Sequence, residues 1–295
     1  LLNNVAVPGA NSFDPTGLGV FPASGNPVAG SSGGYGVLTR VILGNLTQVQ
    51  KAVQANPTFA SVWIGNNDVL SFAISGTTTG VTALNTFVAN YAATVNQLVA
   101  GSPGLQAGTR GSAPRGVLFG VVDVTNTPQI FQLSVFNPAS TATGPNAYNP
   151  AALATLRAIF GVGTARPSTF QIAFANCNSS QASISFQALA QINAGLAANA
   201  PGYTFNCAAG ATALQGGTGI LDDAERQTLV DRVAAYNAYI RAKADSVGFF
   251  YYDPNVRFAA LRANGSIPPF INLQSAQQPA GGQPFGGFIS LDGVH

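Results

Sequence analysis

The chain has 295 residues, of which 46% are hydrophobic and only 7% are charged. Its length allows one large domain, and its apolar content is enough to fill a core, which excludes a disordered chain. The 12 basic and 10 acidic residues are scattered without a basic cluster, so we expect no nucleic-acid partner. No run of about 18 apolar residues occurs, which excludes a membrane-spanning helix within this chain.

Short apolar runs that end in polar or turn residues predict strands. The first covers residues 1–7 and ends at a Pro-Gly turn, and the later ones cover residues 59–64, 117–122 and 249–252. These runs do not alternate with polar residues. They therefore predict strands buried on both faces, as in a parallel sheet covered by helices.

Two amphipathic patterns lie between the predicted strands. Apolar residues recur at steps of three and four between residues 84 and 99, which predicts a helix with one apolar stripe. A second helix is predicted from a capping box of Asp222 and Glu225 to a stop at Gly248. Its expected inward face is Leu229, Val233, Tyr236, Ile240 and Val247. Strands that alternate with helices predict the α/β fold class.

The stretch from about residue 125 to residue 219 is too long for a simple connection. We interpret it as an insertion that caps one end of the sheet, or as a surface decoration without a catalytic role. It holds both cysteines of the chain, Cys177 and Cys207. Two cysteines and one distant histidine are too few for a structural zinc site, so we predict a disulfide and an oxidising compartment. Two buried thiols are the alternative.

Three short motifs carry residues suited to catalysis. Asp292 precedes His295 by three residues, close enough to bond one ring nitrogen and leave the other as a base that can activate a serine. The Gly-Asn-Asn-Asp motif at residues 65–68 follows a predicted strand, where an asparagine amide can donate to an oxyanion. Gly9 follows another predicted strand and presents an N–H. Local hydrogen bonding and ordinary turns explain the same residues without catalysis.

In this order, the motifs resemble the conserved blocks of the GDSL or SGNH hydrolases, a family of serine esterases and lipases. The resemblance implies a single domain over residues 1–295, with a mainly parallel sheet in flavodoxin-like order inside a three-layer α/β/α sandwich. It also implies a role for each motif residue: Gly9 and Asn67 as oxyanion-hole donors, His295 as general base and acid, Asp292 as the group that orients it, and Gly65 and Asp68 as supports of the loop.

The family's first block, a Gly-Asp-Ser after the first strand, has no counterpart in the chain. We therefore expect the chain to be a fragment truncated at both ends, with the nucleophilic serine upstream of Leu1. Serines near the motifs do not stand in a Gly-Asp-Ser context, and none is assigned as the nucleophile. These serines are Ser12, Ser31, Ser32 and Ser290.

The resemblance implies serine-dependent hydrolysis of carboxylic esters of small molecules or lipids, without a metal or other cofactor. It also favours a protein that is secreted, periplasmic or on an outer surface, with a lipid anchor on a removed amino-terminal segment as one option. Two other functions stay open. One is a carbohydrate O-deacetylase, and the other is a non-catalytic extracellular module that binds polysaccharide through its neutral loops.

Overall fold

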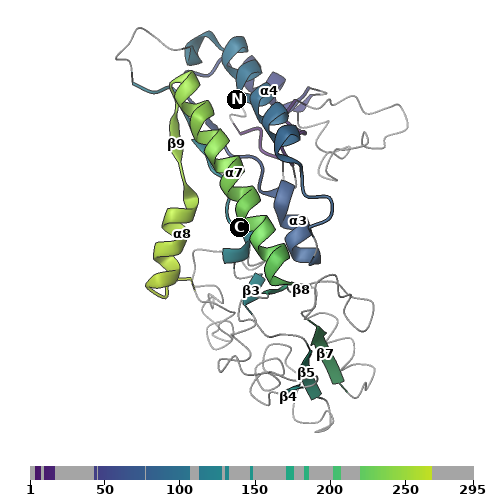
Figure 1. Cartoon of the computed structure of the whole chain (residues 1–295). Helices are drawn as coiled ribbons and strands as arrows, with labels where there is room; N and C mark the ends of the chain where they lie inside the picture. Colours follow the sequence, from purple (N-terminus) through teal and green to yellow (C-terminus); the bar gives the residue numbers. More distant parts are fainter. Residues whose placement is uncertain are drawn as a thin grey trace, which may run out of the picture. The chain divides into compact units, whose positions relative to one another are not determined.

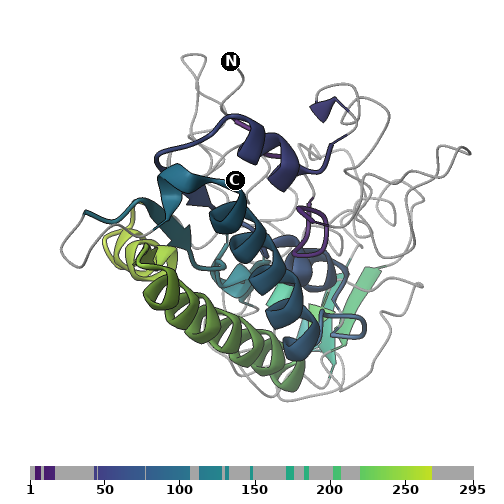
Figure 2. The same cartoon turned by 90° about the horizontal axis from the view of Figure 1, so that it is seen from above.

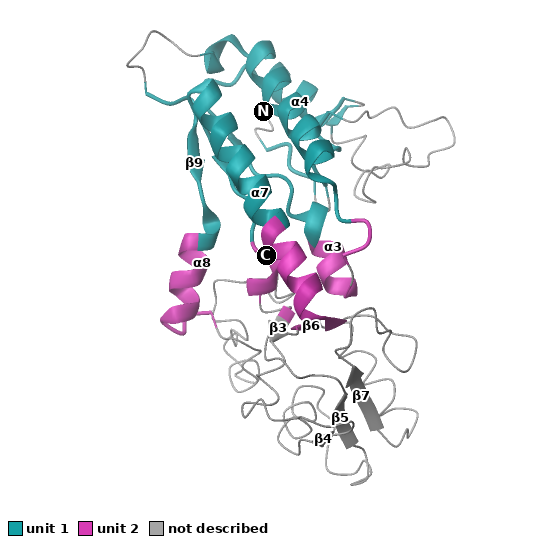
Figure 3. Cartoon of the chain, viewed as in Figure 1, with its two compact units in different colours: residues 1–69, 81–122, 232–255 teal, residues 70–80, 123–231, 256–295 magenta. Residues whose placement is uncertain are grey.

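The structure of the chain is a computed structural model that describes part of the sequence in two compact units (Figure 3). The described residues are 4–7, 10–16, 43–44, 46–76, 78–106, 113–127, 130–132, 147–148, 171–175, 183–185, 202–206 and 220–267. Unit 1 is drawn from Leu1–Val69, Val81–Val122 and Arg232–Asn255, and unit 2 from Leu70–Gly80, Asp123–Asp231 and Val256–His295.

Unit 1 is built on a small parallel sheet. Strands β1 (Ala60–Val62), β2 (Gly116–Phe119) and β9 (Phe250–Tyr252) lie in the order β1-β2-β9, and both neighbouring pairs are parallel. Each strand lies in or overlaps one of the apolar runs that predicted a strand. Because helices connect these parallel strands, the described part of the chain has an α/β arrangement.

Residues 4–7 belong to the first predicted strand, but they form no strand. The side-chain amide of Gln48 donates to the carbonyl of Val5 at 2.7 Å, and Asn4 Oδ1 accepts the N–H of Ala6 at 2.9 Å. These side chains bond backbone groups that a neighbouring strand would otherwise bond. The apolar run therefore predicted the wrong local structure here.

Helices α4 (Leu84–Gly101) and α7 (Asp223–Val247) form the helical layer of unit 1, to which the part of α7 from residue 232 belongs. This part of α7 runs beside α4 in both views (Figures 1 and 2). The ring of Phe87 stacks on that of Tyr236, with centroids 3.8 Å apart and an interplanar angle of 11°. Both side chains are fully buried, so this stack joins the two helices at the core.

The sequence signals of α7 are confirmed at both ends of the helix. Asp222 Oδ1 accepts the N–H of Glu225 at 2.8 Å, and Glu225 Oε2 accepts the N–H of Asp222 at 3.1 Å, which completes the capping box. Gly248 follows the last helical turn with φ +70°. The predicted stripe is buried at Leu229, Val233, Tyr236 and Ile240, whereas Val247 is half-buried.

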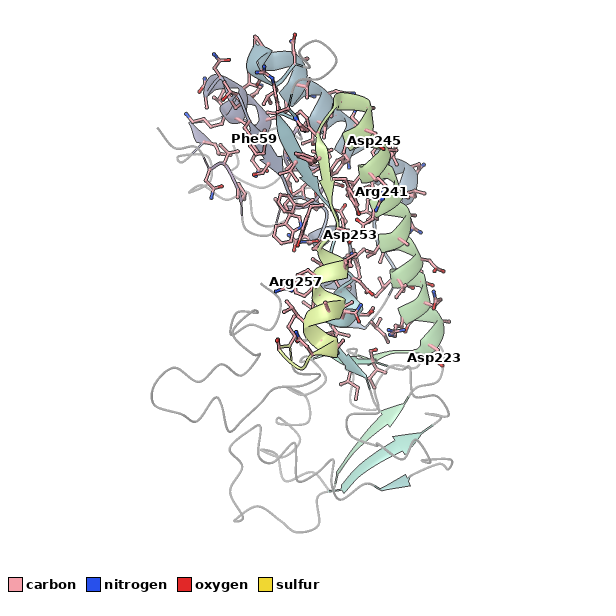
Figure 4. All side chains as sticks on the ribbon, turned by 90° about the vertical axis from the view of Figure 1, so that its left-hand side faces the viewer. Phe59, Asp223, Arg241, Asp245, Asp253 and Arg257 are labelled. Atoms are coloured by element: carbon pink, nitrogen blue, oxygen red, sulfur yellow. The ribbon has the colours of Figure 1, made fainter. Side chains whose placement is uncertain are left out.

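Arg241 connects α7 to the last strand of the sheet. Its guanidinium carbon lies 4.7 Å from the ring centroid of Tyr251 in β9, a cation–π contact. Figure 4 labels Arg241 on α7 and Asp253 just after β9. The contact ties the helix to a strand that lies at the end of the described sheet order.

The chain also forms shorter helices before, between and after the strands of the parallel sheet. Helix α2 (Gln48–Gln54) begins at a capping box of Thr47 and Gln50 and precedes β1. Helix α3 (Asn67–Ser75) begins directly after the loop that follows β1, and only its first residues belong to unit 1. The remaining helical segments are η1 (Pro103–Leu105), η2 (Val124–Asn126) and α8 (Pro254–Ala263).

Three aromatic rings on the parallel sheet, those of Trp63, Phe119 and Tyr252, contact one another in a row, which we call the aromatic row. The ring of Trp63 stacks on that of Phe119, and Phe119 meets Tyr252 edge-on, each pair with centroids 5.4 Å apart. Trp63 and Tyr252 are exposed, as are the neighbouring Phe59 and Phe250. The prediction of strands buried on both faces is therefore wrong for β1 and β9. The sheet order β1-β2-β9 advances in one direction along the chain, and crossovers between parallel strands are as a rule right-handed, so α4 and α7 are expected on the same face, where the stack of Phe87 on Tyr236 joins them.

Unit 2 contains two further three-stranded sheets. In the first, β3 (Ile130–Gln132), β6 (Ser183–Ser185) and β8 (Ile220–Leu221) are antiparallel. In the second, β5 (Gln171–Ala175) pairs antiparallel with β4 (Ala147–Tyr148) and parallel with β7 (Gly202–Asn206). All of these strands except β8 lie within the predicted insertion over about residues 125–219. The single-domain assignment and the limits of the insertion stay predictions.

Exposure of the aromatic row can be tested through Trp63, the only tryptophan of the chain. Because Trp63 is 52% exposed, we expect acrylamide to quench its fluorescence in the folded chain nearly as efficiently as in the chain unfolded by urea. Far-UV circular dichroism on the same sample verifies that the chain is folded. Strong protection of Trp63 from the quencher in the folded sample would contradict an exposed aromatic row.

Candidate active site

Side-chain amides join the segments that follow the three described strands of unit 1. Asn66 Oδ1 accepts the N–H of Val122 at 2.9 Å, and Asn255 Nδ2 donates to the carbonyl of Val121 at 2.9 Å. From α7, Asn237 Oδ1 accepts the Val121 N–H at 2.6 Å, and its Nδ2 donates to the Val121 carbonyl at 2.9 Å. Parallel α/β sheets assemble their sites beyond the carboxyl ends of the strands. The residues around these loops are therefore the candidates.

Gly65 is the residue that lets the loop after β1 pack against the core. Its φ is +114°, a conformation that side chains disfavour. A Cβ atom on Gly65 would come within 2.8 Å of both the Phe87 ring and a methyl group of Val121. Glycine is thus required for two reasons, backbone conformation and space, and it fixes where the next three residues of the motif lie.

Asn67 begins α3, and its side chain reaches the segment that follows Gly9. Its Nδ2 donates to the carbonyl of Ala10 at 2.8 Å, across 57 residues of sequence. A primary amide carries two N–H donors, and this bond uses one of them. Asn67 is half-buried, and within the described ranges its second N–H has no partner. Its amide can therefore donate to a further acceptor.

Gly9 and Pro8 lie outside the described residues, whereas Val7 and Ala10 of the same motif are described. Ala10 is buried, and its N–H donates to the carbonyl of Val7 at 3.2 Å. The carbonyl of the same Ala10 accepts the bond from Asn67. The structure therefore brings together two of the three predicted motifs, the one that contains Gly9 and the one at residues 65–68.

Asp68 is buried and binds the same amino-terminal segment. Its Oδ2 accepts the N–H of Ser12 and its Oδ1 accepts the Ser12 hydroxyl, both at 2.7 Å. The carbonyl of Asp68 accepts the N–H of Thr82 at 3.4 Å. The Ser12 side chain is fully buried and its hydroxyl donates to a carboxylate, so Ser12 is not placed to attack a substrate.

Burial raises the pKa values of two groups, Asp68 and Tyr236. Desolvation raises the pKa of the Asp68 carboxyl above its ordinary value of 3.8, while the bonds from Ser12 and Thr82 act in the opposite direction. Burial also raises the pKa of Tyr236, and the Asp68 charge adds to that effect. The Tyr236 hydroxyl and the Arg232 guanidinium both donate to the carbonyl of Thr82, the latter at 3.0 Å.

The other predicted site residues fall in the undescribed part of the chain. Asp292 and His295, the predicted orienting acid and base, lie outside the described residues, as do Cys177 and Cys207. Their roles and the disulfide stay predictions. Among the residues that are described, no group of three or more His, Cys, Asp or Glu could hold a metal ion. In that same part of the chain, no helix has the length and apolar character needed to cross a bilayer.

Several buried polar residues of the site carry little or no signal in the sequence. In the sequence, Ser12 stands out only as a serine near a motif that lacks the Gly-Asp-Ser context, whereas in the structure it is the partner of Asp68. Asn237 carries a usable signal, because it is a polar residue next to Tyr236 on the buried side of α7. A polar side chain in such a position usually bonds buried backbone.

Comparisons with protein-family models, curated proteins and solved structures found no match for the chain.

The double requirement for glycine at position 65 predicts the effect of a single methyl group. Gly65→Ala should lower the free energy of unfolding by about 3 kcal/mol, because it combines backbone strain with overpacking against Phe87. Gly248→Ala is the matched control, since Gly248 also has a positive φ but no atom lies within 4 Å of the place its Cβ would take. The control should cost only about 1 kcal/mol. Equal losses in urea unfolding would contradict tight packing at Gly65.

The raised pKa of Asp68 predicts how stability changes with pH. A carboxyl with a raised pKa in the folded state stabilises the fold below its unfolded value, and this contribution is lost as pH rises through the folded value. The stability of the wild type relative to Asp68→Asn should therefore fall from about pH 3.8 upward, by about 1.4 kcal/mol for each pH unit between the two pKa values.

Urea unfolding of both proteins across this pH range measures the effect. Asp245→Asn, which changes an exposed carboxylate on α7, controls for the loss of one negative charge. A relative stability of the wild type that increases with pH would mean that hydrogen bonds outweigh burial at Asp68, and would contradict this assignment.

Proposed function

We propose that the protein is a serine hydrolase of the GDSL or SGNH type that cleaves carboxylic esters, an esterase or lipase. The observation that carries the proposal is the 2.8 Å bond from Asn67 Nδ2 to the Ala10 carbonyl. This bond joins the two motifs expected to supply oxyanion donors, at the carboxyl edge of a parallel sheet. The order of the three motifs along the chain supports the same family.

In the proposed mechanism, a serine hydroxyl attacks the ester carbonyl carbon while His295 takes its proton. The Gly9 N–H and the Asn67 amide hold the oxyanion of the tetrahedral intermediate, together with the N–H of the serine. His295 then protonates the leaving alcohol, and Asp292 keeps the imidazole oriented. Water, deprotonated by His295, attacks the acyl-enzyme; the bond between the acyl group and the serine oxygen then breaks, the carboxylic acid leaves, and His295 returns the proton to the serine.

The proposal places the nucleophile outside residues 1–295, because no serine of this chain stands in a Gly-Asp-Ser sequence. Ser12 is further disfavoured by its burial and by its bonds to Asp68. Secretion, and the Cys177 to Cys207 disulfide that suits an oxidising compartment, belong to the same proposal.

We extend the proposal to the fold, a three-layer α/β/α sandwich with flavodoxin-like strand order. The exposed aromatic row supports it, because α4 and α7 lie in two crossovers that advance in the same direction and are therefore expected to cover only one sheet face. A further strand beside β1, reached by a crossover in the opposite direction, would bring a helix to the other face. That helix would bury Trp63 and Tyr252.

A non-catalytic polysaccharide-binding module is the second candidate. The exposed rings of Trp63 and Tyr252 favour it, since contiguous apolar surface that faces solvent often marks an interaction site. A carbohydrate O-deacetylase shares the proposed ester chemistry and differs only in its substrate. Activity of the full-length protein on acetylated sugars, short acyl esters and long acyl esters separates these functions.

The role of Asn67 predicts the loss caused by removing its amide. In the full-length protein, Asn67→Ala should lower kcat for a short acyl ester by about 100-fold or more, because one preorganised oxyanion donor is lost. The Asn96→Ala variant, on an exposed part of α4, controls for the loss of an asparagine elsewhere. Full turnover by Asn67→Ala, with the same unfolding midpoint as the wild type, would remove Asn67 from the mechanism.

A further inference from the structure

We propose that Ser12 and Asp68 are positioning residues for the Asn67 amide. Asp68 holds the segment at residues 10–14 through Ser12, and this segment presents the Ala10 carbonyl that orients the amide. The effect on turnover rests on the proposed function, whereas the effect on the Asn67 amide can be measured without any activity.

Two adjacent residues of α3 bind two positions of one short segment. Asn67 bonds Ala10 at 2.8 Å, and Asp68 bonds both the N–H and the hydroxyl of Ser12 at 2.7 Å. Because Ala10 and Ser12 are separated by one residue, fixing Ser12 also restricts the carbonyl of Ala10. The bonds from Asp68 and the bond from Asn67 therefore support one another.

The segment has its own internal bonds, which restrict the movement of its residues relative to one another. Asn11 N–H donates to Asp14 Oδ2 at 2.8 Å, and Phe13 N–H donates to Asn11 Oδ1 at 3.0 Å. On its far side, Asn90 Nδ2 approaches the Ser12 hydroxyl oxygen at 3.4 Å. A shift at Ser12 would therefore be transmitted to Ala10 rather than absorbed by a loose loop.

Orientation matters because the terminal torsion of an asparagine side chain has a broad energy minimum. The amide group is planar, so a bond from one N–H of Asn67 to Ala10 also sets the direction of the second N–H. Donors held in place before the reaction contribute most to oxyanion stabilisation. Loosening the Ala10 carbonyl should thus weaken the donor without removing it.

The buried carboxylate explains why position 12 carries a serine. A buried carboxylate needs donors, and Ser12 supplies two of them. Alanine at position 12 keeps the N–H but loses the hydroxyl. Asp68→Asn is the conservative change, since the amide oxygen can accept the Ser12 N–H while the amide nitrogen donates to the hydroxyl oxygen.

The kinetic test is a double-mutant cycle in the full-length protein. We expect Ser12→Ala to lower kcat about 10-fold with little change in KM, less than the loss from Asn67→Ala, and Asp68→Asn to retain most of the wild-type rate. Ser12→Ala combined with Asn67→Ala should be no slower than Asn67→Ala alone, because Ser12 acts through Asn67. Additive losses would overturn the positioning role.

The matched control is Ser102→Ala. Ser102 is also fully buried, but its hydroxyl has no hydrogen-bond partner among the residues that the structure describes. It should leave kcat unchanged. A loss of kcat equal to that of Ser12→Ala would mean that removing any buried serine has this effect, and would overturn the proposal.

The second readout is the pair of side-chain amide signals of Asn67 in a ¹⁵N-labelled sample, assigned by their absence in Asn67→Ala. In the wild type, one of the two protons should exchange slowly with water because it is bonded to Ala10. Ser12→Ala should make it exchange faster, whereas Ser102→Ala should not. Unchanged exchange in Ser12→Ala overturns the positioning role even if the esterase proposal holds, and faster exchange supports it even if no ester is cleaved.

Discussion

The buried carboxylate of Asp68 is the group on which the arrangement of the candidate site depends. It lies at the start of α3, directly after the loop of β1, and binds Ser12, which lies 56 residues earlier in the chain. Burying a carboxylate is unfavourable unless hydrogen-bond donors surround it, so the folded chain must hold its donors close to Asp68. Two residues from Ser12, the Ala10 carbonyl accepts the bond from Asn67, so the two motifs of the candidate site meet beside this contact.

Around this contact, the segments that follow the parallel strands form one edge of the sheet, and the helices form a buried core on one of its faces. The stack of Phe87 on Tyr236 buries the helical face, and the amide of Asn237 bonds both backbone groups of Val121. Asn66 and Asn255 link the neighbouring loops to the same short stretch. The aromatic row is not covered by these helices, so its Trp63 and Tyr252 rings are exposed, whereas the rings of Phe87 and Tyr236 are buried.

The elements with the strongest local signals could be predicted from the sequence. Helix α7 followed from its capping box and Gly248, and the three sheet strands followed from apolar runs. The burial of those strands could not be predicted, because a run of apolar residues does not show how many helices cover the sheet. The segment at residues 4–7 and the Ser12 to Asp68 pair depend on partners more than 40 residues away, which local patterns do not reveal.

The proposed function requires that this chain belong to an enzyme with an activated serine. Its most direct test is the reaction of the full-length protein with a fluorophosphonate, which forms a stable adduct only with such a serine, followed by peptide mapping with mass spectrometry. We expect one adduct, on a serine in a Gly-Asp-Ser sequence outside residues 1–295, and its loss in His295→Ala. No adduct would contradict an activated serine, and an adduct on a serine within residues 1–295 would contradict the assignment of the nucleophile to a Gly-Asp-Ser sequence.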